Sequence, residues 1–333
     1  MTGPDAIRAG EAAEQGGDLV LAAAAYQSAL DHADRSLVAD AHFHLGRVAW
    51  RQGRYDDALS AYTKARSLAV ESDSTEVRAR VENGIGAVHY ARGEYAQARA
   101  AYGVALELTA EPSLRAKIVL NLGVIANIEG DLEDARDHYQ NSRALFREAR
   151  DLAGEALTLH NIGMLHADLE EWDEADEAYK RCLELCEAQG NKQMIANVLL
   201  NRSELSCARE RYGDAVASCD LALSIYSAIG DEVGRGEAMR WKGHALRHMG
   251  QLDQAERTLH EAARVAHRTQ VKLLEAEATR DLAAVHRARG DAFGASKHVE
   301  RALELFTSLG AQREVDELAS ELKTLAPSGG AGA

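Results

Sequence analysis

The feature that most constrains this chain is a spacing that recurs along nearly its whole length. A small residue is followed by Ala 12 positions later, by Tyr or another apolar residue 16 positions later, and by a second small residue 19 positions later. Gly46, for example, is followed by Ala58, Tyr62 and Ala65. Eight small residues, here called the anchors, start this spacing: Gly10, Gly46, Gly86, Gly123, Gly163, Ser203, Gly243 and Ala283. Intervals of 36–40 residues between anchors predict one structural unit repeated eight times.

Each unit reads as two helices joined by a tight turn. The residues 12, 16 and 19 positions after an anchor are four and three apart, so they share one face of a helix. Glycine inside a helix costs about 1 kcal/mol relative to Ala, so a glycine anchor indicates close approach of a second helix.

A glycine stands seven positions after most anchors, where a left-handed residue can end the first helix. Glu170 and Glu210 occupy this position in the fifth and sixth units, and we expect those two turns to be built differently. The glycines at the other turns are Gly17, Gly53, Gly93, Gly130, Gly250 and Gly290.

This pattern resembles that of tetratricopeptide repeat (TPR) proteins, whose helix-turn-helix unit has the same order of small, Ala, aromatic and Ala positions. The resemblance covers roughly residues 3–310. It implies an all-α fold, a right-handed α-solenoid (superhelix) of eight TPR helix pairs. The period near 40 and the missing proline after the second helix are similar to the long repeats of spindle-orientation adaptors and bacterial peptide receptors. Members of the family are mostly protein- or peptide-binding solenoids, and few are enzymes.

The chain is predicted to be one continuous array with a helix covering its end. No Pro-rich linker interrupts residues 3–310, and the repeats start near residues 3, 39, 79, 116, 156, 196, 236 and 276. Residues 311–325 form a C-terminal capping helix with an apolar stripe of Val315, Leu318, Leu322 and Leu325. The tail, residues 326–333, is expected to be disordered.

Charge and composition exclude several classes of protein. A net charge of −15 argues against general nucleic-acid binding, which needs a basic surface. The N-terminus lacks the pattern of a signal peptide, and no run approaches 18 apolar residues, so we expect no membrane span. Four unclustered cysteines fit a reducing, cytoplasmic location.

Patterns typical of catalysis or metal binding are weak. Neither a phosphate-binding loop nor a dinucleotide-binding glycine pattern follows a strand. His244 and His248 have the spacing of two zinc ligands, but the Glu of the metalloprotease pattern is missing and no third ligand is identifiable. Cys182 and Cys186 lie one helical turn apart, and Cys182 takes a small-residue core position. We expect no metal, no cofactor and no enzymatic activity.

The resemblance implies that the first helix of each pair lines an inner surface. The residues two before, and one or four after, each anchor then face this surface, Met164 and Glu204 among them. Three consecutive units place Asn at the first of these positions, and Asn83 lies one residue away from it. Asn amides pair with the N–H and C=O groups of an extended peptide, although such residues also cap helices or face water. The predicted peptide-binding asparagines are Asn83, Asn121, Asn127, Asn161 and Asn201.

Basic and aromatic residues flank these asparagines on both sides. Trp and Arg are frequent anchors of protein interfaces, so we include them in the predicted peptide-binding surface. They are Arg47, Trp50 and Tyr90 on one side, and Trp241, His244, Arg247, Arg280 and Arg287 on the other.

The predicted function is that of a non-catalytic adaptor or scaffold that holds an extended protein or peptide segment in its concave groove. Two alternatives remain open. One is a regulatory receptor that responds to a peptide and acts on another protein. The other is a structural scaffold that assembles with itself, as a homo-oligomer, through the N-terminal repeat.

Overall fold

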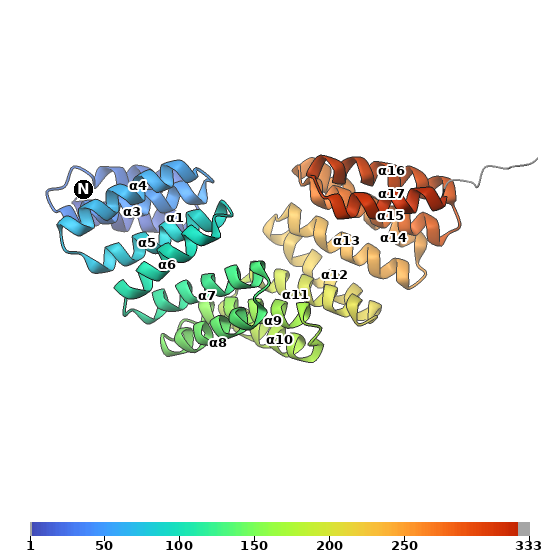
Figure 1. The fold of residues 1–333 in the computed structure, drawn as a ribbon, viewed down its shortest axis with the longest axis horizontal. Helices are drawn as coiled ribbons and strands as arrows, with labels where there is room; N and C mark the ends of the chain where they lie inside the picture. Colours follow the sequence, from blue (N-terminus) through green and yellow to red (C-terminus); the bar gives the residue numbers. More distant parts are fainter. Residues whose placement is uncertain (1, 326–333) are drawn as a thin grey trace, which may run out of the picture. The chain divides into compact units, whose positions relative to one another are not determined.

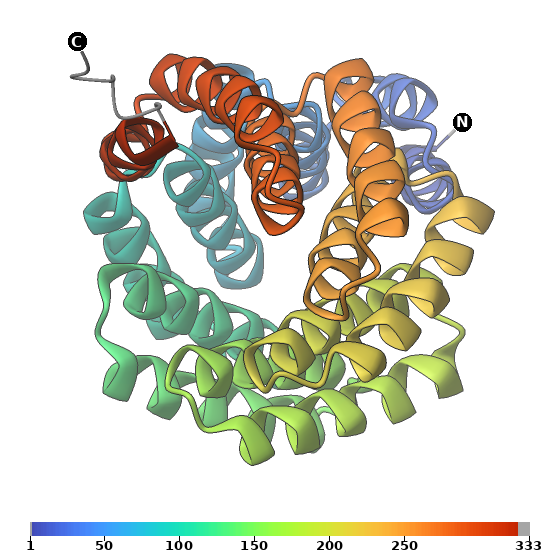
Figure 2. The same ribbon diagram turned by 90° about the vertical axis from the view of Figure 1, so that its right-hand side faces the viewer.

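The computed structural model describes residues 2–325, and helices joined by short turns make up this part of the chain (Figure 1). A second view, turned by 90°, shows the same succession (Figure 2). Residues 2–325 contain no strand. The helices are α1 (Gly3–Gln15), α2 (Leu19–Ser28), α3 (Arg35–Arg51), α4 (Tyr55–Glu71), α5 (Thr75–Ala91), α6 (Tyr95–Leu108), α7 (Pro112–Glu129), α8 (Leu132–Glu148), α9 (Leu152–Asp168), α10 (Trp172–Gln189), α11 (Lys192–Ala208), α12 (Tyr212–Ile229), α13 (Glu232–His248), α14 (Leu252–Thr269), α15 (Lys272–Ala288), α16 (Ala292–Leu309) and α17 (Gln312–Leu325).

These helices form eight consecutive pairs followed by α17, which confirms the predicted all-α repeat architecture in residues 2–325. They group into two compact units, Met1–Asn161 and Ile162–Ala333. The odd-numbered helix of each pair carries the anchor, and the even-numbered helix carries the residue 16 positions later. Within each unit, neighbouring helices pack directly on one another, as α3 does on α4 and α13 on α14.

The anchors lie where a large side chain of the second helix crosses the first. A Cβ atom added to Gly46 would lie 2.6 Å from the Tyr62 ring, and one added to Gly163 would lie 2.4 Å from Tyr179. Such distances leave no room for a methyl group. The units with larger anchors have smaller partners at the opposing position: Ser203 with Cys219, and Ala283 with Val299. The close approach predicted from the anchors is therefore confirmed, and the volume of the pair is roughly conserved.

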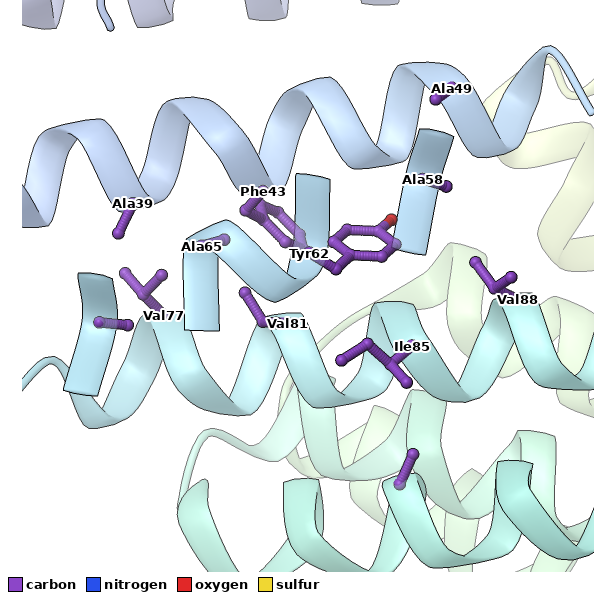
Figure 3. Close-up of a cluster of buried hydrophobic side chains, with 12 residues drawn as sticks. Ala39, Phe43, Ala49, Ala58, Tyr62, Ala65, Val77, Val81, Ile85 and Val88 are labelled. Carbon is purple, nitrogen blue, oxygen red and sulfur yellow. The ribbon is translucent and has the colours of Figure 1, made fainter. Parts of the chain in front are cut away.

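The side chain of Tyr62 illustrates how one pair joins the next. It extends from α4 between α3 and α5, where it meets Phe43 and lies among Val81, Ile85 and other buried apolar residues (Figure 3). The Tyr62 side chain is almost completely buried. A single residue of the repeat thus fills space both within its own pair and against the following one.

The intervals from Gly10 to Gly46 and from Gly86 to Gly123 are shorter than the others because the second helix of each pair is short. The helix α2 has 10 residues and α6 has 14, whereas the other second helices have 17 or 18. The helix α6 ends at Leu108, and Pro112 begins α7 at a position where its missing N–H costs no hydrogen bond.

All turns inside the described pairs use the same backbone geometry, so the expectation for Glu170 and Glu210 was wrong. Gly130 has φ of 83°, and the N–H of the next residue donates to the Ala126 carbonyl at 2.9 Å. Glu170 and Glu210 adopt φ of 58° and 56°, and the residues after them donate to the equivalent carbonyls at 2.8 Å. The hydrogen bonds that close the turn hold a non-glycine residue in a conformation that is normally unfavourable by about 1–2 kcal/mol.

The last helix, α17, covers the apolar side of the eighth pair. Leu318 is 2% exposed and packs in one cluster with Ala283, Val299 and Phe306. Val315, Leu322 and Leu325 flank that cluster, as the predicted apolar stripe requires. The predicted disordered tail, residues 326–333, lies outside the described residues.

A cluster of three histidines lies on α14, α15 and α16. The His298 ring is 5.0 Å from the ring of His286 and 5.8 Å from that of His260, between ring centroids. Two carboxylates lie beside His286: Asp291 is 2.8 Å from its Nδ1, and Glu256 is 3.4 Å from its Nε2. Burial and the two neighbouring histidines lower the pKa of His298 from 6.5 to about 4, and Lys297 adds to this effect.

Replacing Glu210 with Gly is expected to stabilise the protein by about 0.5–1 kcal/mol, because glycine adopts the left-handed conformation without a Cβ clash. Urea unfolding followed by helical circular dichroism measures the change. Glu210→Ala is the matched control, because it removes the carboxylate and retains the strain. If Ala stabilises as much as Gly, the side chain and not the backbone is responsible.

The low pKa of His298 predicts a loss of stability in acid. As the pH falls from 6.5 towards 4, the unfolded chain gains a proton at His298 before the folded chain does, so the free energy of unfolding decreases. The variant His298→Gln should lose less stability over this range than the parent protein. The exposed His267→Gln serves as the control, and thermal unfolding at pH 7 and pH 5 is the measurement. Equal losses in all three proteins would contradict the prediction.

Candidate functional site

The predicted site residues of the first unit, Met1–Asn161, occupy different environments. Arg47 donates to the Glu14 carboxylate at 2.7 Å, and Glu14 is only 7% exposed. Trp50 is 38% exposed, so part of its ring is open to a partner. Tyr90 is half-buried, with its ring 6.1 Å from that of Tyr95. In this unit Trp50 and Tyr90 therefore keep accessible ring surface, whereas the Arg47 guanidinium is already paired with Glu14.

The position two residues before an anchor contacts the large ring of the preceding pair. In the first unit, the His44 ring stacks on Tyr26 at 4.7 Å, and Tyr62 fills the space beside Gly84. Asn121, at the same position of the next pair, lies close enough to the Tyr102 hydroxyl to lower its pKa against the effect of burial. In the second unit Asn201, at the equivalent position, forms a hydrogen bond with Tyr179.

The contacts of Asn121 with Tyr102 and of Asn201 with Tyr179 have a structural reason. Burial raises the pKa of both Tyr102 and Tyr179 above the ordinary value, so each hydroxyl stays neutral and needs a polar partner away from water. An Asn amide has two donor hydrogens and an acceptor oxygen, so it can serve as the polar partner of a buried tyrosine hydroxyl. Asn121 and Asn201 are half-buried, so part of each amide reaches the surface.

The other predicted asparagines differ from this arrangement. Asn161 is half-buried and favours the protonated form of the neighbouring His160, whose pKa burial lowers. The side-chain oxygens of Asn83 and Asn127 are buried and have no hydrogen-bond donor among the described residues. The five asparagines predicted to bind a peptide therefore lie in different chemical environments.

The flanking residues of the second unit, Ile162–Ala333, form a network around Arg240. Its guanidinium lies 4.4 Å from the Trp241 ring, 3.4 Å from Glu277 and 3.6 Å from Asp281. His244 is 3.9 Å from the same Asp281 carboxylate and 5.6 Å from the Trp241 ring. Basic and acidic groups alternate on this face.

The three predicted arginines of this unit have partners of their own. An Arg247 Nη atom lies 2.6 Å from His248 Nε2, and burial lowers the pKa of Arg247. The Arg280 guanidinium lies 5.6 Å from the Phe306 ring, and Arg287 forms an ion pair with Glu321 of α17. Each of these three arginines therefore already contacts another side chain of the protein.

A pocket of about 250 Å³ lies in the second unit on α9, α10 and α11. Its lining combines apolar walls with two carboxylates and the Asn201 amide. The lining residues are Met164, Ala167, Asp168, Trp172, Tyr179, Asn201, Glu204, Leu205 and Ala208. The positions of Met164, Ala167, Asn201 and Glu204 follow the predicted inward-facing pattern, whereas Asp168 and Trp172 lie outside it and were missed.

Glu204 is the most unusual group of this pocket. The protein around it raises the pKa of its carboxyl group, mainly by displacing water and further through the charges of Asp168, Glu277 and Glu237. Arg240 opposes this rise without cancelling it. The carboxylate of Glu204 forms no hydrogen bond or ion pair with any residue of the described range 2–325.

No group of three or more His, Cys, Asp or Glu side chains in residues 2–325 is arranged to hold a metal ion, and the four cysteines are free and buried. None of the helices in this range combines the length and the hydropathy that a membrane span requires.

Comparison with known proteins identifies the repeat. A family model for the tetratricopeptide repeat matches residues 37–111 and 114–188. No curated protein matches the sequence.

Several solved structures share the fold. A Rap protein complexed with competence and sporulation factor is 13% identical, with 97% of this chain and 95% of that chain covered and a TM-score of 0.62. Aspartyl phosphate phosphatase F from Bacillus subtilis is 11% identical over 99% of this chain and 95% of its own, with a TM-score of 0.59. A signal-transduction ATPase with a tetratricopeptide repeat sensor, from Pyrococcus horikoshii, is 16% identical over 87% of this chain and 43% of its own, with a TM-score of 0.63.

At these identities the structural likeness establishes the fold alone. Together with the eight anchored helix pairs and the matching family model, it shows an all-α solenoid that contains tetratricopeptide repeats at residues 37–111 and 114–188.

Proposed function

We propose that this protein is a non-catalytic scaffold that binds an extended peptide segment of a partner. The observation that carries the proposal is the pocket of the second unit, where the Asn201 amide meets Trp172 and Met164. Aromatic walls with a few polar groups are typical of binding sites. At about 250 Å³ the pocket is slightly smaller than the range of about 300–1,000 Å³ usual for small-molecule sites, which favours part of a peptide over a compact ligand.

The chemistry of Asn201 suits a peptide backbone. One side of its amide holds the Tyr179 hydroxyl, and this contact fixes the orientation of the amide. An amide carries both donor and acceptor groups, the two kinds that pair with the C=O and N–H groups of an extended chain. A pre-oriented group loses little freedom when a ligand binds, which improves affinity.

The remaining predicted residues are proposed as further contacts within their own units. In the first unit these are Asn83, Asn121, Asn127, Asn161, Arg47, Trp50 and Tyr90. In the second unit Trp241 and His244 are favoured, because Arg247, Arg280 and Arg287 already have intramolecular partners. One protein of the same fold, a Rap protein, was solved with competence and sporulation factor bound, which supports ligand binding by such a scaffold.

A second candidate function, self-assembly through the N-terminal repeat, is favoured by an observation on α2. Val20 is 77% exposed and Leu21 is 57% exposed, side by side at the start of this short helix. Neighbouring exposed apolar residues are a common feature of contact surfaces. A regulatory receptor that passes the peptide signal to another protein is compatible with either candidate.

Binding through the Asn201 amide is tested with peptides selected from a displayed library of random decapeptides. Asn201→Ala is expected to weaken a selected peptide about two- to tenfold, since one hydrogen bond contributes about 0.5–1.5 kcal/mol. Isothermal titration calorimetry measures the affinity. Tyr179→Phe is the matched control: it removes the hydroxyl partner of Asn201 and leaves the amide in place.

The two variants separate a ligand contact from a structural one. Tyr179→Phe should lower stability by about 1 kcal/mol and change affinity less than Asn201→Ala does. Equal losses of affinity would mean that the amide acts only by holding the tyrosine. A library that yields no binder would overturn the proposed function.

Self-assembly is tested by light scattering over a range of protein concentrations. If α2 forms the contact, the mass should rise with concentration above 36.0 kDa in the parent protein and remain constant after the double change Val20→Lys and Leu21→Lys. A constant monomer mass in the parent protein would eliminate this candidate.

A further inference from the structure

We propose that the pocket on α9, α10 and α11 is a specificity pocket for a basic side chain, Lys or Arg, of the bound peptide. The inference rests on the proposed peptide-binding function and adds the chemical class of the residue that is recognised. Glu204 supplies the charge that pairs with the cation, Asp168 reinforces it, and Trp172 and Met164 form the walls along the apolar stem.

The carboxylate of Glu204 is available for a ligand. It is exposed at the pocket, and it has neither a hydrogen-bond partner nor an ion-pair partner in residues 2–325. It follows the anchor Ser203, whose side chain is completely buried and donates to the Leu200 carbonyl at 2.6 Å. The anchor therefore fixes the backbone from which Glu204 projects.

The charges around the pocket favour a cation. Asp168 lines the same cavity, and Glu237 and Glu277 are close enough to act on the Glu204 carboxyl group. The nearest compensating charge, Arg240, is shared between Glu277 and Asp281 and stacks on Trp241. A neutral ligand would leave Glu204 unpaired in a partly desolvated site, and an acidic ligand would add to the repulsion.

The walls select a long cation over a small one. Trp172, Met164 and Leu205 provide apolar surface beside the two carboxylates. Lys and Arg bury their methylene stems on such surfaces while the charged end meets a carboxylate. An aromatic wall also attracts a cation held against its face. No metal-binding group was found in the described residues, so the carboxylates form no recognisable metal site there.

The test uses the same displayed library of random decapeptides with three proteins: the parent, Glu204→Gln and Glu177→Gln. Glu177 is an exposed residue of α10 outside the pocket, and its change removes the same charge. The parent and Glu177→Gln should select peptides with Arg or Lys at one fixed position. Glu204→Gln should lose this preference, with circular dichroism confirming that it is folded.

A double-mutant cycle then measures the interaction between Glu204 and the Arg side chain of the peptide. A selected peptide is compared with a version in which citrulline, the neutral analogue, replaces its Arg. The parent should bind the citrulline peptide at least about tenfold more weakly, whereas Glu204→Gln should bind the two peptides equally. Because Glu204 must be ionised, the preference of the parent for the Arg peptide should also decrease as the pH is lowered.

The outcomes separate the two proposals. Selected peptides without a basic preference, or an equal citrulline effect in the parent and in Glu204→Gln, would overturn this inference and leave the peptide-binding function standing. Failure of all three proteins to select any peptide would overturn the proposed function, and this inference with it.

Discussion

The structure depends on one contact, repeated in each pair: a small anchor on the first helix against a large side chain on the second. At Gly46 and Tyr62 the approach is so close that even a methyl group on the anchor would clash. Where the anchor is larger, as at Ser203 and Ala283, the opposing residue is smaller. Because this contact sets the distance between the two helices, it also sets where the neighbouring side chains, including the inward-facing ones, can lie.

The proposed binding surface follows from that packing. Positions near the anchors point away from the second helix of their own pair, and they meet the ring of the pair before them or the solvent. Asn201 does both: its amide forms a hydrogen bond with Tyr179 of the pair before it, and it also lines the pocket. The same repeat geometry that buries the tyrosine therefore creates a polar group with a fixed direction at the surface.

Most of the fold followed from the sequence because the pattern is local and repeated. The pairs, the turns with glycine and the apolar stripe of α17 were all predicted from spacing. The turns at Glu170 and Glu210 were predicted wrongly, since the backbone hydrogen bonds of the turn outweigh the preference of a single residue. The pocket was predicted only in part. Asp168 is the last residue of α9 and Trp172 the first of α10, outside the inward-facing positions of the repeat. The lack of a partner for the Glu204 carboxylate depends on distances that no spacing encodes.

The hydrogen bond between Asn201 and Tyr179 would link the proposed ligand binding to the cooperativity of the solenoid. In repeat proteins, stability is approximately the sum of the stabilities of the units and of the interfaces between neighbours. Asn201 belongs to one pair and Tyr179 to the pair before it, so their bond contributes to such an interface. If the proposed ligand binds Asn201 best while Tyr179 orients the amide, the bond adds a coupling free energy to ligand binding. By thermodynamic reciprocity, the bound ligand then stabilises the interface between these two pairs by the same free energy.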